Sequence, residues 1–156
     1  MQAQPVFADP VYISKVGRAL TKKELKTIDE FKREKVPNQL NTTSKNNYVL
    51  ENKILKNIKK DIHGYILDYF DKVICTSSSI TPYITQSWLN YTEPNQAHQP
   101  HAHSNSHISG VFYVAADKEV DSIVFYKRDH LALELTIEKH NIFNSRSWKF
   151  PVETGD

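Results

Sequence analysis

The spacing of apolar residues changes near residue 75, and this change limits the possible folds more than any other feature of the sequence. Before residue 75, apolar residues recur every three or four positions, which is the period of an amphipathic helix. After it, β-branched and aromatic residues gather in short runs between turn residues, which is typical of half-buried strands. The pattern predicts an α+β protein whose helices precede its strands.

A first, short helix is expected to begin at a capping box. Thr21 and Glu24 have the spacing of this motif, and Leu20 and Leu25 occupy the two staple positions around it. Pro37 bounds the segment, since proline ends a helix.

A second, longer helix is expected over residues 49–70, because apolar residues recur there at i, i+4. The residues that should form its buried face are Leu50, Ile54, Ile58, Ile62, Ile66 and Phe70. The lysines that we interpret as its solvated face are Lys53, Lys56, Lys59 and Lys60.

Five strand candidates follow, and their close spacing predicts antiparallel sheets. They are residues 80–91, 108–115, 122–126, 131–137 and 148–152. Side chains alternate along a strand, so Gln86, Trp88 and Asn90 should share one face of the first.

The chain has 156 residues, a length typical of one domain. We expect a single domain over 1–156, with a helical part at 1–75 and a β part at 76–156. Its single cysteine, Cys75, cannot form an internal disulfide, and we expect it to be a small buried apolar residue.

Composition and charge exclude several function classes. No apolar run approaches the roughly 20 residues needed to span a bilayer, and residues 1–10 lack the features of a secretory signal. A net charge of +2 is too small to indicate a nucleic-acid partner. Together with the single cysteine, these features predict a cytoplasmic protein with neither a membrane nor a nucleic-acid partner.

Four of the seven histidines lie close together, at His98, His101, His103 and His107. In an extended segment, residues i and i+2 point to the same side, so His101 and His103 can bind one metal ion. Pro100 favours the extended conformation that this requires. Imidazole is a common ligand of iron, zinc, copper and nickel, and at least one further ligand must come from elsewhere.

Around the histidines, three short motifs together resemble a known family. They are Trp88-x-Asn90, Pro100-His101-x-His103 and Ser109-Gly110-x-x-Tyr113. This pattern is similar to that of the 2-oxoglutarate and Fe(II)-dependent oxygenases, and the similarity extends from about residue 48 to residue 156. The resemblance implies a double-stranded β-helix, a cupin-like jelly roll, that follows the two helices.

The resemblance also implies a function. It makes His101 the first metal ligand, His103 the second, and Fe(II) and 2-oxoglutarate the cofactors of a dioxygenase. Such an oxidoreductase hydroxylates its substrate through a ferryl intermediate, and here the substrate is an unidentified small molecule or peptidyl side chain. Asn90 and Tyr113 are the candidates for binding the oxoacid.

Two departures from the family pattern leave alternatives open. His103 stands where most of the superfamily has a carboxylate, and the sequence shows neither the late strand with its distal histidine nor the arginine that follows. We therefore expect an incomplete β-helix whose third metal ligand is a distal histidine outside this sequence. His130 or His140 could replace it only in an arrangement that the family pattern does not predict. His98 is expected on the loop near the substrate, whereas the spacing of His107 resembles that of a cupin ligand.

The alternative function is a cupin-like metal-binding module, or a truncated and inactive oxygenase fold that acts in binding or assembly. An incomplete β-helix would leave a sheet edge unpaired, which predicts a homo-oligomer.

Overall fold

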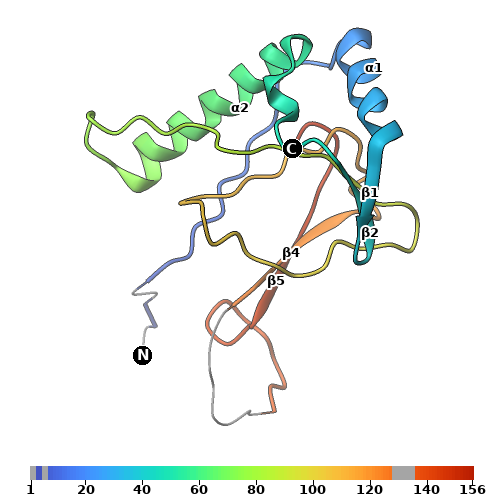
Figure 1. Ribbon diagram of the computed structural model, residues 1–156. Coiled ribbons are helices and arrows are strands. Elements are labelled where there is room, and N and C mark those ends of the chain that lie inside the picture. The colour runs from blue at the N-terminus through green and yellow to red at the C-terminus, as the bar shows by residue number, and fades with distance from the viewer. Residues whose placement is uncertain (1–2, 5–6, 128–135) are drawn as a thin grey trace. The chain divides into compact units, whose positions relative to one another are not determined.

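The computed structural model describes residues 3–4, 7–127 and 136–156 (Figure 1). The chain divides into two compact units. The larger is Ser14–Phe112, and the smaller combines Met1–Ile13 with Tyr113–Asp156. Both helices and a three-stranded sheet belong to the larger unit, and a two-stranded sheet belongs to the smaller.

Helix α1 (Lys22–Phe31) begins at the predicted capping box. The hydroxyl of Thr21 accepts a hydrogen bond from the backbone N–H of Glu24 at 3.2 Å, and the Glu24 carboxylate accepts one from the Thr21 N–H at 2.7 Å. These two bonds satisfy N–H groups that the first helical turn cannot pair.

Helix α2 (Lys56–Tyr69) is shorter than the predicted helix at 49–70. The residues before it form two 3₁₀ turns, η2 (Val49–Glu51) and η3 (Lys53–Leu55). Asn52 separates these turns because its backbone is extended and its side chain accepts a hydrogen bond from the Ile54 N–H at 2.8 Å. A local side-chain bond to the backbone therefore replaces the first turns of the predicted α-helix.

The core of the larger unit forms where α1 meets the residues at the start of α2. Ile28, Val49, Leu55 and Ile58 are buried there. Most of the predicted apolar stripe of α2 is only half-buried, and Ile58 is its fully buried member.

A π-helical turn, η4 (Phe70–Ile74), follows α2 and ends at Cys75. The prediction that Cys75 is buried was wrong, since its side chain is exposed. Its backbone has φ 54°, so it ends the helix in the left-handed conformation instead of continuing an apolar run.

The three-stranded sheet consists of β1 (Lys35–Asn38), β2 (Asn41–Ser44) and β3 (Asn90–Tyr91), antiparallel in that order. Figure 1 labels β1 and β2. The β1–β2 hairpin was not predicted. Its signal is weak, because each strand has only four residues and Thr42 and Thr43 are its only adjacent β-branched pair.

The smaller unit contains β4 (Ser122–Tyr126) and β5 (Ser147–Pro151), which pair antiparallel. The strand predictions at 122–126 and 148–152 are confirmed, the second with a shift of one residue.

Two other strand predictions were wrong, because residues 108–115 form no strand and only the last two residues of 80–91 do. Ser87 there forms an isolated bridge with Tyr48, too little pairing for a continuous strand. Most of the candidate at 131–137 lies outside the described residues. The described part of the protein is thus α+β with small antiparallel sheets, and it forms no closed jelly roll.

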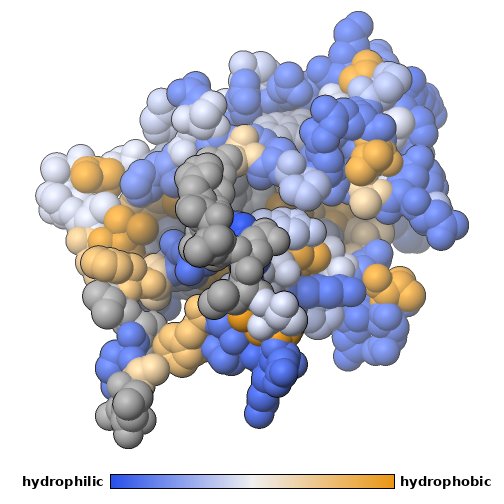
Figure 2. All heavy atoms as spheres, turned by 90° about the horizontal axis from the view of Figure 1, so that it is seen from below, coloured by the Kyte–Doolittle hydropathy of each residue, from blue (hydrophilic) through white to orange (hydrophobic). Residues whose placement is uncertain are grey.

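On the face shown in Figure 2, hydrophilic residues surround apolar ones that stand singly or in small groups. None of the helices in the described ranges is long and apolar enough to cross a membrane.

Candidate metal centre

One side of the candidate site is built on the sheet and on residues 86–88 beside it. The backbone N–H of Ser87 donates to the Asn47 carbonyl at 2.9 Å, and the Ser87 carbonyl accepts from the Val49 N–H at 2.9 Å. Leu89 continues this pairing, since its carbonyl accepts from the Ser44 N–H at 2.9 Å. Trp88 is therefore held between two residues whose backbones are fixed.

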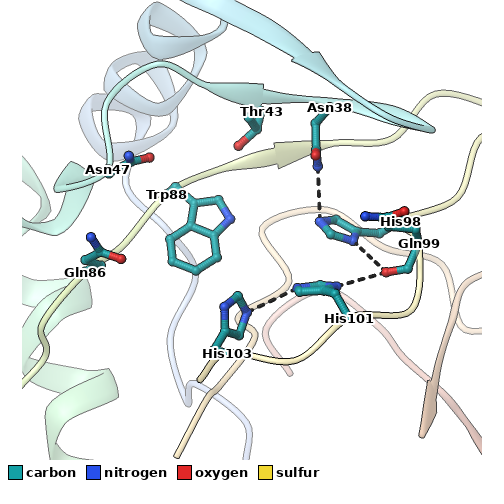
Figure 3. A pocket seen from close by; sticks show the side chains of 9 residues that line it. All are labelled: Asn38, Thr43, Asn47, Gln86, Trp88, His98, Gln99, His101 and His103. Carbon is teal, nitrogen blue, oxygen red and sulfur yellow. Dashed lines mark hydrogen bonds between the residues drawn. The ribbon is translucent and has the colours of Figure 1, made fainter. Parts of the chain in front are cut away.

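The other side is the segment from His98 to His103, which contains neither helix nor strand. An open pocket of about 320 Å³ lies between the two sides (Figure 3). Its lining residues are Asn38, Thr43, Asn47, Gln86, Trp88, His98, Gln99, His101 and His103. Aromatic rings, amides and one hydroxyl thus line the pocket, and no carboxylate, lysine or arginine does.

The structure brings the rings of His101 and His103 together. Their Nε2 atoms are 3.1 Å apart, their ring centroids are 4.7 Å apart, and the ring planes are almost perpendicular at 87°. An aligned N–H···N bond of this length would separate the centroids by about 5.4 Å. At least one ring is therefore inclined to the line that joins their Nε2 atoms.

This arrangement fits two ligands of one metal ion. Imidazole nitrogens at neighbouring positions on an ion, each about 2.1 Å from it, lie about 3 Å apart. The His101 and His103 nitrogens have about that spacing. Within the described ranges, no group of three or more His, Cys, Asp or Glu side chains is placed to hold a metal, so the pair accounts for two positions only.

Hydrogen bonds define which nitrogen of His101 carries the proton. Its Nδ1 lies 2.9 Å from the carbonyl oxygen of Gln99, and a carbonyl can only accept. Nδ1 is therefore protonated, so in the neutral ring Nε2 keeps its lone pair. A carbonyl partner on the other ring nitrogen is what metal-binding histidines commonly have.

His103 lies against Trp88, with ring centroids 5.2 Å apart in an edge-on arrangement. Burial lowers the pKa of His103, and the neighbouring rings of His101 and His98 lower it further. These effects favour the neutral ring, which is the form that binds metals.

The third histidine, His98, also lines the pocket, and its ring centroid is 4.4 Å from that of His101. Both of its nitrogens have partners: Nδ1 lies 3.1 Å from the Gln99 carbonyl, and Nε2 lies 3.3 Å from Nδ2 of Asn38. The structure therefore places His98 beside the histidine pair, with neither nitrogen free.

The two residues predicted to bind the oxoacid are outside this pocket lining. Asn90 is exposed on β3, opposite Thr43 of β2. Tyr113 belongs to the smaller unit, where its backbone is hydrogen-bonded to Gly155 and Asp156. Burial, and then the charges of nearby carboxylates, raise the pKa of the Tyr113 phenol. Binding of 2-oxoglutarate by Asn90 and Tyr113 stays a prediction.

The two other candidate histidines that the structure describes do not line the pocket. His107 is exposed, with its ring centroid 5.9 Å from that of Phe70, and it does not line the pocket. His140 is exposed in the smaller unit. His130 lies outside the described residues.

Sequence reasoning missed Asn38, Thr43 and Asn47 as pocket residues. All three lie in or just after the β1–β2 hairpin, which was itself not predicted. The one available signal was the density of Asn and Thr between residues 38 and 47, which is unusual for a plain connection.

The structure thus places two converging imidazoles beside an uncharged pocket in an α+β protein. Residues 86–152 match the model of a family described as "Putative 2OG-Fe(II) oxygenase", as the motifs predicted. The match includes both His101 and His103. The comparison with curated proteins gave no match, and neither did the comparison with solved structures.

Proposed function

We propose that this protein is a 2-oxoglutarate and Fe(II)-dependent dioxygenase in which His101 and His103 bind the iron. The observation that carries the proposal is the 3.1 Å separation of their Nε2 atoms within the segment that matches the family. The motif suggested the pair, and the independent support is that both nitrogens face each other at the spacing of two metal ligands.

Each residue of the site would have a distinct task. His101 and His103 would occupy two positions on the iron, and the Gln99 carbonyl would keep the His101 ring in the required tautomer. Bound iron, with dioxygen and 2-oxoglutarate, supplies the chemistry that converts a C–H bond into C–OH while the oxoacid loses carbon dioxide and becomes succinate. Asn90 and Tyr113 remain our candidates for binding the oxoacid.

The pocket favours an uncharged reacting group on the substrate. None of its lining side chains is acidic or basic at neutral pH, apart from the imidazoles. A charged substrate group would find no side chain of opposite charge there. Asn47 and Gln86 offer amide donors and acceptors, and Trp88 offers an apolar ring surface.

An anaerobic titration tests the proposal. The purified chain receives Fe(II) and then 2-oxoglutarate, and the visible absorbance that appears when the oxoacid chelates iron is recorded. We expect this absorbance in the wild type and its loss in His101→Ala and in His103→Ala.

The matched control is His107→Ala, which removes an exposed histidine of the same segment that does not line the pocket. It should retain the absorbance. Equal absorbance in His101→Ala and the wild type would refute the assignment of the ligands, and absence of iron from the wild type by elemental analysis would refute the metal site.

A second candidate function is a cupin-like metal-binding module without turnover. It is favoured by the imidazole of His103, where a carboxylate would complete the usual triad, and by the absence of a third ligand group within the described ranges. Iron binding by the wild type with no spectral response to 2-oxoglutarate would support this function instead.

Three further predictions belong to the same proposal. We propose an incomplete double-stranded β-helix preceded by the two helices, a cytoplasmic location, and a homo-oligomer formed by pairing of sheet edges. Light scattering on the purified chain measures its oligomeric state, and a monomeric mass at micromolar concentration would contradict the proposed homo-oligomer.

A further inference from the structure

We propose that Asn38 and His98 are positioning residues, which hold the Gln99 carbonyl so that the Nε2 lone pair of His101 faces His103. The inference deepens the proposed function, and it rests on that function where it concerns metal affinity. Its statement about the protonation site of His101 applies to the metal-free protein as well.

The histidine pair needs this support because it lies in a segment that no helix or strand holds in place. Residues 92–112 contain neither helix nor strand, so no ladder of backbone hydrogen bonds fixes the position of the Gln99 carbonyl. The 3.3 Å contact between Asn38 and His98 connects this segment to the β1–β2 hairpin (Figure 3). A side chain of regular structure thereby anchors an irregular segment.

The direction of each hydrogen bond follows from the chemistry of its partner. The Gln99 carbonyl can only accept, so Nδ1 of His98 and Nδ1 of His101 both donate to it, at 3.1 and 2.9 Å. With Nδ1 protonated, the neutral His98 ring has a lone pair on Nε2, and the amide nitrogen of Asn38 donates to it. The Gln99 carbonyl thus accepts hydrogen bonds from the imidazoles of both His98 and His101.

The orientation of the Asn38 amide is itself fixed. Its Nδ2 also donates to Oδ1 of Asn41 at 2.9 Å, and Nδ2 of Asn41 donates to the hydroxyl of Thr92 at 3.2 Å. Asn41 is buried, with 6% of its surface exposed, so this part of the chain of bonds is shielded from water. The network therefore runs from a buried residue of β2 to the first proposed metal ligand.

The consequence concerns the tautomer of His101. Without a fixed acceptor beside Nδ1, the proton of a neutral imidazole exchanges between its two nitrogens, and a ring protonated on Nε2 cannot bind metal through that atom. Second-sphere partners of this kind typically change metal affinity 10–100-fold when they are removed.

Three variants isolate the effect. His98→Phe keeps a ring beside His101 but removes both hydrogen bonds of the imidazole. His98→Gln retains an N–H that can donate to the Gln99 carbonyl and an oxygen that can accept from Asn38 after an adjustment of its side chain. Asn38→Asp preserves the shape of the side chain but removes the donor to His98.

Two measurements are made on each variant: NMR of the imidazole nitrogens in the metal-free protein, and calorimetric titration with Zn²⁺, a redox-inert probe. In the wild type we expect His101 to be protonated on Nδ1. In His98→Phe and Asn38→Asp we expect a mixture of tautomers and a Zn²⁺ affinity about tenfold lower. His98→Gln should restore the wild-type tautomer and most of the affinity, which a purely structural role of the ring would not do.

The inference fails if His101 of the wild type is protonated on Nε2, or if His98→Phe and Asn38→Asp leave both readouts unchanged. It also fails if His98→Gln behaves like His98→Phe. If the wild type does not bind Zn²⁺, the proposed metal site fails, and the tautomers alone decide the present inference. Circular dichroism identifies any variant that does not fold, and the test then relies on the variants that do fold.

Discussion

At the scale of single residues, Glu24 shows how hydrogen bonds stabilise a buried carboxylate in this small core. Only 2% of its surface is exposed, yet its carboxylate accepts bonds from Nη1 and Nη2 of Arg18 at 2.9 and 2.8 Å and from the backbone and hydroxyl of Thr21. The Arg18 bonds lower the pKa of Glu24 to about 2, against the opposing effect of burial, and the Thr21 bonds add to the decrease. Arg18 also bonds to Asp61 of α2 at 2.9 Å, so one guanidinium connects both helices.

The lowered pKa of the Glu24 carboxylate predicts that the free energy of unfolding decreases at acidic pH. Its pKa in the folded protein lies below the ordinary value of 4.5, so its contribution is present above that pH and is lost as the pH falls towards about 2. The free-energy advantage of the wild type over Glu24→Gln should therefore shrink over this window by on the order of 3 kcal/mol.

Urea unfolding at a series of pH values measures this difference. Asp29→Asn, a substitution on the same helix away from the Arg18 bonds, is the comparison variant. A wild type and a Glu24→Gln variant with parallel pH profiles would contradict the assignment.

At the scale of elements, α1 depends on its first turn. Replacing Thr21 by Ala removes the hydroxyl that accepts the Glu24 N–H and should lower the free energy of unfolding by about 1 kcal/mol. Thr21→Ser retains the hydroxyl and should stay within a few tenths of a kcal/mol of the wild type. Chemical denaturation measures both, and equal losses in the two variants would show that the methyl group of Thr21 matters, not its hydroxyl.

The β1–β2 hairpin contains a strained position. Gln39, between the strands, has φ 31°, a conformation that disfavours any residue with a Cβ atom. Gln39→Gly should therefore stabilise the protein by up to about 1 kcal/mol. Leu40→Gly, at the neighbouring position without positive φ, should instead destabilise it, because added backbone freedom is not offset there by relief of strain.

Thermal unfolding distinguishes these two glycine variants. A destabilised Gln39→Gly would mean that the hairpin does not hold Gln39 in this conformation in solution. Because Asn38 ends β1, the same hairpin places the donor to His98, so its stability also bears on the metal site.

At the scale of the whole molecule, metal binding should raise stability. An ion that binds only the folded state adds about 2.7 kcal/mol to the free energy of unfolding at a concentration of 100 times its Kd. The increase should appear in the wild type and in His107→Ala and be absent from His101→Ala. Denaturation with and without Fe(II) under anaerobic conditions measures it, and an equal increase in His101→Ala would place the ion elsewhere.

The chain as a whole also shows how far a local pattern predicts the position of a site. The His-x-His spacing predicted that His101 and His103 point to one side, and their Nε2 atoms do approach each other. Gln86 and Trp88 share the pocket as the alternation of a strand predicts, although Asn90 does not join them. Asn90 lies in β3, where it pairs with Thr43 of β2 and is exposed.

The sequence by itself determined the features that arise within a few residues: the capping box at Thr21 and the pairing of two imidazoles. Their interactions need only the local backbone conformation, so residue type and spacing suffice. The tertiary structure alone decided that Asn38 meets His98, sixty residues further along the chain. Such a contact depends on how the hairpin and the histidine segment pack, and no spacing in the sequence encodes that packing.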